Sequence, residues 1–121
     1  MPSTVSAHSA VQAISQNGRV NVRDLAQEID VPLEVLAAAL GKSTRWLNAD
    51  PEAASIQPNA VRIVGMVNDL AEHLGEKRYA LFWLKTPQPE FGNATPIDYL
   101  REGRLELVLG LANDIVRMVP D

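Results

Sequence analysis

The sequence contains no cysteine in its 121 residues. Disulfide bridges, thiolate catalysis and cysteine-type zinc sites are therefore excluded, and a reducing cytoplasm is the natural location. Long apolar runs are also missing, because no stretch approaches the roughly 20 residues that a membrane span requires. Residues 1–13 have no basic region followed by a hydrophobic block, so they do not resemble a secretory signal. We therefore expect a cytoplasmic protein without a membrane role.

An excess of positive charge is absent as well. The formal net charge is −4 and the sequence pI is about 5.1. Residues 1–60 carry four basic side chains against six acidic ones, and residues 61–121 carry seven against nine. Neither half is a basic arm, which weighs against strong non-specific binding of nucleic acid.

The short motifs of common enzyme classes are missing too. The sequence has no phosphate-binding glycine loop, dinucleotide fingerprint, zinc-protease helix or hydrolase nucleophile elbow. Its two histidines, His8 and His73, have no further metal ligands at suitable spacing, and Glu72 and Glu76 beside His73 fit a solvated helix face. We therefore expect no enzyme activity, no metal, no cofactor and no small-molecule substrate.

The composition is that of an ordinary globular protein, with 46% hydrophobic and 21% charged residues. Apolar residues recur at helical spacing between glycine and proline stops, and no convincing strand is present, so the sequence predicts an all-α fold. The expected helices span residues 7–16, 22–29, 32–40, 44–48, 59–74, 76–85, 96–102 and 104–118, separated by non-helical loops at 49–57 and 86–95. In the first of these helices, Val11 and Ile14 lie on the same face.

Several helix boundaries carry specific local signals. Asn21 is a good N-cap for the helix that buries Val22, Leu25, Ala26 and Ile29. Pro32 is expected in the first turn of the following helix. In the helix 59–74, an apolar stripe is expected to be core, formed by Ala60, Ile63, Val67, Leu70 and Leu74.

Residues 32–48 fit a helix-turn-helix. Ala37 is a small residue where two helices would touch, and Gly41 permits the positive φ of a tight turn. The side chains available for DNA on the second helix are of types that contact phosphates and base edges, and they are Lys42, Ser43, Thr44, Arg45 and Asn48. Because the local charge is low, a dimer or a partner would be needed for useful affinity.

A second register and a simpler interpretation compete with this one. Residues 22–40 could instead be the helix pair, with its break at residues 30–32, although its second helix would offer DNA only Glu34 and a row of alanines. Alternatively, the three helices form only a packing unit. The interpretation of residues 32–48 is the one we prefer.

The C-terminal half contains a dense group of aromatic residues, prolines and glycines. Phe91 can fold the proline-containing loop back onto Phe82 and Trp83, and Gly92 supplies a tight turn. Thr95 caps the helix that Pro96 opens, and Asp98 strengthens the same N-terminus through the helix dipole. These features fix one loop between two helices.

The same segment resembles the toxin-binding domain of the Xre/MbcA/ParS antitoxin family. Twelve residues fall on the family's pattern within about 26 positions, namely Trp83, Leu84, Pro87, Phe91, Gly92, Thr95, Pro96, Ile97, Asp98, Leu100, Gly103 and Val108. A helix-turn-helix usually precedes this domain, so the resemblance covers about residues 32–119. It implies an N-terminal helical region at 1–57 packed with a helical toxin-binding domain at 58–121.

The resemblance also implies a partner. Members of the family typically pair with a toxin of the RES class, which degrades NAD, and the antitoxin blocks the active site of the toxin. The complex often represses its own operon. By this resemblance the chain is a homodimeric type II antitoxin that contacts its toxin through the loop 86–95 and the last helix to Asp121, and it binds operator DNA.

The last helix is apolar on more than one side, which indicates an interface with a partner or a second copy. One face carries Leu105, Val108, Leu109, Ala112, Ile115, Val116 and Val119. The candidate contact residues for the toxin or the dimer are Phe91, Arg101, Arg104, Leu107, Leu111, Arg117 and Met118. The alternatives are a stand-alone DNA-binding regulator with a dimerising C-terminal domain, and a structural adaptor without a DNA role.

Overall fold

Between residues 22 and 118 the chain folds into helices that are joined by short turns and loops. The computed structural model describes residues 11–118. Its helices are α2 (Val22–Glu28), α3 (Leu33–Leu40), α4 (Thr44–Ala49), α5 (Gln57–Leu74), α6 (Lys77–Leu84), α7 (Pro96–Arg101) and α8 (Leu105–Arg117), with single 3₁₀ turns at η1 (Ala54–Ile56) and η2 (Pro89–Phe91). Within residues 11–118 the β-pairing is limited to two isolated bridges. The predicted all-α fold is confirmed.

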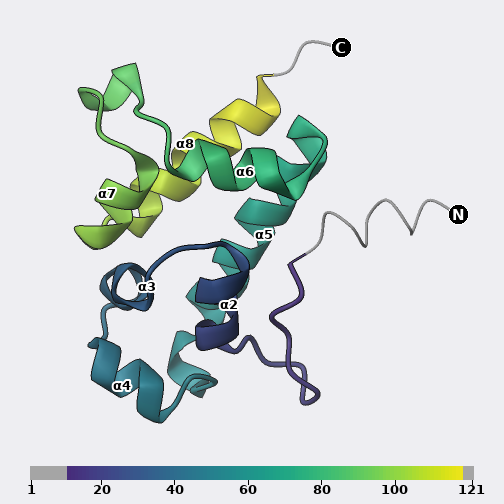
Figure 1. Cartoon of the computed structure of the whole chain (residues 1–121), viewed down its shortest axis with the longest axis vertical. Coiled ribbons are helices and arrows are strands. Elements are labelled where there is room, and N and C mark those ends of the chain that lie inside the picture. The colour runs from purple at the N-terminus through teal and green to yellow at the C-terminus, as the bar shows by residue number, and fades with distance from the viewer. Residues whose placement is uncertain (1–10, 119–121) are drawn as a thin grey trace, which may run out of the picture.

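The long helix α5 organises the molecule. Figure 1 shows α2, α3 and α4 around one end of α5, and α6, α7 and α8 around the other. Helix α5 packs along α6 and α8, and α3 packs against α7. Buried residues from Val11 to Ala112 join one hydrophobic core. The N-terminal helices and the C-terminal helices therefore share packing surfaces.

The predicted helix over residues 7–16 is wrong where it can be tested. Residues 7–10 lie outside the described residues, and residues 11–16 form no helix, because Ile14 lies in a β-bridge and a turn begins at Gln16. Ile14 pairs with Val20 in an antiparallel bridge across the turn at Gly18. Extended backbone alternates its faces, so Val11 is buried while Ile14 is 48% exposed.

Glu52 holds this N-terminal hairpin against the loop before α5. Its carboxylate accepts hydrogen bonds from Ser15 Oγ, Asn17 Nδ2 and Asn21 Nδ2, each at 3.1 Å. Arg19 Nη1 donates a hydrogen bond to the backbone oxygen of Glu52 at 3.2 Å. These bonds lower the pKa of Glu52, those from Asn21 and Asn17 contributing most. Glu52 thus ties the hairpin to the rest of the fold together with Gln57, whose amide bonds both backbone groups of Val20, and Asn68, which accepts from the Val11 N–H.

The predicted helix boundaries are largely confirmed. The side chain of Asn21 accepts from the backbone N–H groups of Arg23 and Asp24, and all four predicted core residues of this helix are buried. Gly41 and Gly75 end α3 and α5 in the left-handed conformation. Pro32, expected inside the first turn, is instead the N-cap of α3.

Helix α5 differs from the prediction at both ends. It begins at Gln57, two residues earlier than expected, because η1 leads directly into it and leaves the loop 49–57 only partly irregular. Leu74, predicted as core, is 37% exposed. The buried stripe ends at Ala71, since the chain leaves the core at Gly75.

Candidate partner-binding surface

The loop 86–95 forms a compact closed turn between α6 and α7. Gln88 N–H donates to the Ala94 oxygen at 2.9 Å, and Asn93 N–H donates back to the Gln88 oxygen at 2.9 Å. Gly92 and Asn93 both have positive φ, at 65° and 71°. The predicted role of Gly92 in a tight turn is confirmed. The prediction that this loop contains no helix is wrong, because Pro89–Phe91 forms a single 3₁₀ turn. The loop is ordered by its own backbone hydrogen bonds.

The aromatic contact of Phe91 differs from the prediction. Its ring meets Tyr99 of α7 edge-on, with centroids 4.5 Å apart, and Tyr99 Oη donates to the Phe91 oxygen at 3.3 Å. Phe82, an expected partner, is 71% exposed. The loop therefore folds toward the helix that follows it, and Tyr99 was the residue that the sequence interpretation missed.

The other motif residues hold the same loop and its helices. Trp83 is buried at the end of α6, and its indole Nε1 has no hydrogen-bond partner among the described residues. Pro87 is exposed, and Pro96 is buried at the start of α7. Gly103 has a φ of 79°, and a Cβ there would lie 3.4 Å from the Ala38 oxygen. The positive φ, rather than a lack of space against α3, is what favours glycine at position 103.

Thr95 and Asp98 form a complete capping box. Thr95 Oγ1 accepts from the Asp98 N–H at 3.0 Å, and the Asp98 carboxylate accepts from the Thr95 N–H at 2.9 Å. This backbone hydrogen bond is the largest cause of the lowered pKa of Asp98. The predicted cap by Thr95 is confirmed, and the reciprocal hydrogen bond to the Asp98 carboxylate, which was not predicted, completes the capping box.

Helix α8 is amphipathic, and part of its apolar surface stays accessible. Leu105, Val108 and Ala112 are buried in the core. Leu107 and Leu111 are half-buried, and so are Leu109, Ile115 and Val116 from the predicted face. Met118 is 75% exposed and Arg117 is exposed, while Val119 lies outside the described residues.

Of the two other candidate arginines, Arg101 is the last residue of α7 and Arg104 is the N-cap of α8. Arg101 is within 3.8 Å of both Glu34 and Asp98. The Arg104 guanidinium lies 5.1 Å from the Tyr99 ring centroid. Both arginine side chains are exposed. Because the Tyr99 ring contacts both Arg104 and Phe91, it joins these two residues in one continuous surface.

The five predicted DNA-contacting residues lie on and just before α4. The Ser43 hydroxyl accepts from the Trp46 N–H at 3.0 Å and so caps the helix. Lys42 Nζ lies 4.5 Å from the Trp46 ring centroid. Thr44 is half-buried, whereas Arg45 and Asn48 are exposed. Of the five residues, Arg45 and Asn48 are therefore the two whose exposed side chains make neither a capping hydrogen bond nor a contact with Trp46.

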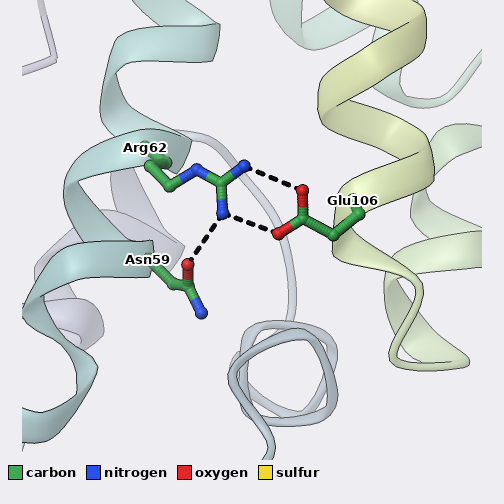
Figure 2. Close-up of polar contacts among 3 residues, drawn as sticks. All are labelled: Asn59, Arg62 and Glu106. Atoms are coloured by element: carbon green, nitrogen blue, oxygen red, sulfur yellow. Dashed lines mark hydrogen bonds and ion pairs between the residues drawn. The ribbon is translucent and has the colours of Figure 1, made fainter.

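An ion pair between α5 and α8 was not predicted. Figure 2 shows the Arg62 guanidinium donating to both carboxylate oxygens of Glu106, at 2.6 and 2.8 Å, and to Asn59 Oδ1 at 3.1 Å. The hydrogen bond from Arg62 lowers the pKa of Glu106, and the same bond raises that of Arg62. The two residues are 44 positions apart, and no local sequence signal connects them.

Residues 11–118 contain neither a metal-binding cluster nor a membrane-spanning helix. No group of three or more His, Asp and Glu side chains in this part of the chain could hold a metal ion. None of its helices is long and apolar enough to cross a membrane.

The comparisons with known proteins agree with the sequence motif. The fold is similar to that of a chain in the crystal structure of the M. tuberculosis MbcT-MbcA toxin-antitoxin complex, with a TM-score of 0.51 and 20% identity, over 84% of this chain and 95% of that chain. No curated protein matches the chain. The predicted resemblance is confirmed, because residues 69–111, from the second half of α5 into α8, match the model of the antitoxin Xre/MbcA/ParS C-terminal toxin-binding domain.

Proposed function

We propose that this chain is a type II antitoxin that neutralises a RES-type, NAD-degrading toxin by covering its active site. The observation that carries the proposal is the match of residues 69–111 to the family's toxin-binding domain. The similar fold within a toxin-antitoxin complex supports it. Inhibition by occlusion requires no chemistry from this chain, which agrees with a sequence that lacks the common catalytic motifs.

The contact surface that we propose consists of the loop 86–95, α7 and α8. The loop is held in one conformation by the bridge between Gln88 and Ala94 and by the contact of Phe91 with Tyr99. A preorganised loop loses little conformational entropy on binding, which favours affinity. Met118 and the half-buried Leu107 and Leu111 supply apolar area on α8.

Arginine side chains provide the polar part of this surface. Arg101, Arg104 and Arg117 are exposed, and arginine is enriched at the energetic centres of protein interfaces. Arg104 is already oriented by the Tyr99 ring. We therefore expect Arg104 to contribute more to toxin binding than Arg101, whose guanidinium has two acidic neighbours in its own chain.

The test is co-expression of the chain with the product of the adjacent gene, followed by affinity purification and measurement of cellular NAD. The proposal predicts co-purification and preservation of NAD. Arg104→Glu and Met118→Glu should release the toxin, while Arg45→Glu on α4 serves as a control that should not. A partner that fails to bind, or that leaves NAD unchanged without this chain, would refute the proposal.

We propose repression of the chain's own operon as a second function. The same binding to DNA is the basis of the alternative, in which the chain is a stand-alone regulator. The favouring observation is that α4 follows Gly41 as predicted and exposes Arg45 and Asn48. A gel-shift titration on the chain's own promoter tests it. Binding should weaken with salt and with Arg45→Ala, and binding without any toxin partner would favour the stand-alone regulator.

A further inference from the structure

Helix α6 carries an exposed aromatic surface that the contact residues proposed above do not include. Tyr79 is 45% exposed and Phe82 is 71% exposed. Successive residues of an α-helix are about 100° apart, so Phe82 lies about 200° round the helix axis from the buried Ala80. Phe82 is therefore on the side of α6 opposite the core. We call the surface formed by Arg78, Tyr79 and Phe82 the α6 face.

The α6 face lies wholly within the segment that matches a toxin-binding domain. All of residues 69–111 are described, and their exposed large hydrophobic side chains are Leu74, Tyr79 and Phe82. Two of these three lie on α6, whereas the loop 86–95, α7 and the matched part of α8 contribute none. A surface that binds a protein usually contains a few large anchoring side chains, among which aromatic residues are enriched. Within the matched segment, Phe82 is the most exposed candidate for such an anchor.

The α6 face also adjoins the proposed contact loop. Helix α6 ends at Leu84 with Lys85 as its C-cap, and the loop 86–95 follows directly. The Thr86 hydroxyl donates to the backbone oxygen of Phe82, one turn earlier, at 2.7 Å. The first residue of the loop is thus fixed to the turn that carries Phe82, so a partner that contacts the loop can also contact this ring.

The charges of α6 favour a protein partner over an anionic one. Its three cations, counting the C-cap, all have acidic partners within the chain, in the pairs Lys77–Glu28, Arg78–Glu76 and Lys85–Asp30. Arg78 also donates to Tyr79 Oη at 3.2 Å and lies 5.0 Å from the centroid of its ring. The α6 face therefore offers apolar area and little unpaired positive charge. This suits an apolar pocket on a protein better than the phosphates of a lipid surface or a nucleic acid.

We infer that Phe82 is an anchor of the toxin interface and that its ring inserts into an apolar pocket on the surface of the toxin. The inference rests on the proposed function, and it adds α6 to the contact surface. Tyr79 borders the anchor, and Arg78 orients Tyr79. Because the Phe82 ring is exposed in the free chain and becomes buried in the complex, its apolar area contributes to binding and hardly to folding.

Calorimetric titration of the purified full chain with the purified product of the adjacent gene tests the inference. Phe82→Ala should raise the dissociation constant by about 30-fold, as expected for a central aromatic residue of an interface. Phe82→Trp keeps an aromatic ring and should retain most of the affinity. Val61→Ala is the matched control and should bind as the wild type does, because Val61 is 55% exposed on α5 but lies outside the matched segment. Urea denaturation should show that all three variants are about as stable as the wild type.

Hydroxyl-radical footprinting of the wild-type chain is a second measurement that requires no substitution. Exposed aromatic and methionine side chains are oxidised readily, so the oxidation of Phe82 should fall when the toxin binds. If Met118 is protected while Phe82 stays reactive, or if Phe82→Ala binds as tightly as the wild type, the inference is wrong and the proposed function stands. If the wild-type chain does not bind the toxin at all, the proposed function itself fails, and the inference fails with it.

Two further measurements distinguish the toxin from other occupants of the α6 face. Sedimentation equilibrium without toxin should give the same oligomeric state for the wild type and Phe82→Ala. Neither protein should bind to phospholipid vesicles that contain phosphatidylserine. A wild-type dimer that Phe82→Ala dissociates would assign the α6 face to a second copy, and vesicle binding that Phe82→Ala abolishes would assign it to a membrane. Either result would overturn the inference.

Discussion

Lys77 Nζ lies 2.5 Å from Glu28 Oε2, which joins the start of α6 to the end of α2 across 49 positions. The two side chains are only 26% and 19% exposed. The pair connects the N-terminal helices to the segment that matches the toxin-binding domain. Its partial burial makes it a better candidate for a stabilising ion pair than the exposed pairs of this chain.

Lys77→Met should lower the free energy of unfolding by about 1–2 kcal/mol, because it leaves the carboxylate of Glu28 shielded from water without its partner. Urea denaturation measures the change. Arg78→Met is the matched control, since its pair with Glu76 is 70% and 57% exposed, and it should change stability much less than Lys77→Met does. Equal effects of the two substitutions would show that burial does not strengthen the Lys77 pair.

Trp83 should be sensitive to loss of volume and insensitive to loss of its N–H group. Trp83→Ala removes a buried ring and should cost about 3–5 kcal/mol. Trp83→Phe keeps most of the ring and should cost about 1–2 kcal/mol, because the indole Nε1 gives up no hydrogen bond within the described residues. Thermal and urea unfolding of the two variants check this order. A Trp83→Phe variant as unstable as Trp83→Ala would indicate that the N–H group does have a partner.

The capping box of α7 should contribute measurably to stability. Thr95→Ala removes the acceptor for the Asp98 N–H and should cost about 1 kcal/mol. Thr95→Ser keeps the hydroxyl and should retain most of that stability. Chemical denaturation gives the comparison, and hydrogen exchange at the Asp98 amide locates it. Unchanged exchange at this amide in Thr95→Ala would argue against the capping role.

Glu52 should make the stability of the fold dependent on pH. Hydrogen bonds from Asn21 and Asn17 lower its pKa below the ordinary value of 4.5. A carboxylate with a lowered pKa stabilises the folded state above its unfolded pKa, and this contribution is lost as the pH falls through the folded pKa. The stability difference between wild type and Glu52→Gln should therefore be largest near neutral pH and shrink below about pH 4.5.

Urea titrations of both proteins between neutral pH and acid measure that difference. Glu90→Gln is a suitable control, because Glu90 is exposed in the loop 86–95. A difference that stays constant, or that grows as the pH falls, would contradict the assignment of Glu52 as a residue that holds the N-terminal hairpin.

Local signals in the sequence were sufficient to predict most of the helices. Asn21, Gly41 and Thr95 act within three or four residues of themselves, through a cap or a positive φ, so their effect can be inferred without knowing the fold. The toxin-binding motif could be recognised for a similar reason, since its prolines and glycines constrain one short loop. The division at residues 57 and 58, the helix-turn-helix and the contact residues remain predictions.

The sequence by itself thus determined the all-α class, the helix boundaries and the family motif, because these depend on interactions between near neighbours. Only the tertiary structure decided that residues 11–16 are not helical, since their partners Val20, Glu52 and Asn68 come from other segments. It also decided that Phe91 meets Tyr99 and that Arg62 pairs with Glu106. Such contacts depend on how helices pack, and no local propensity encodes them.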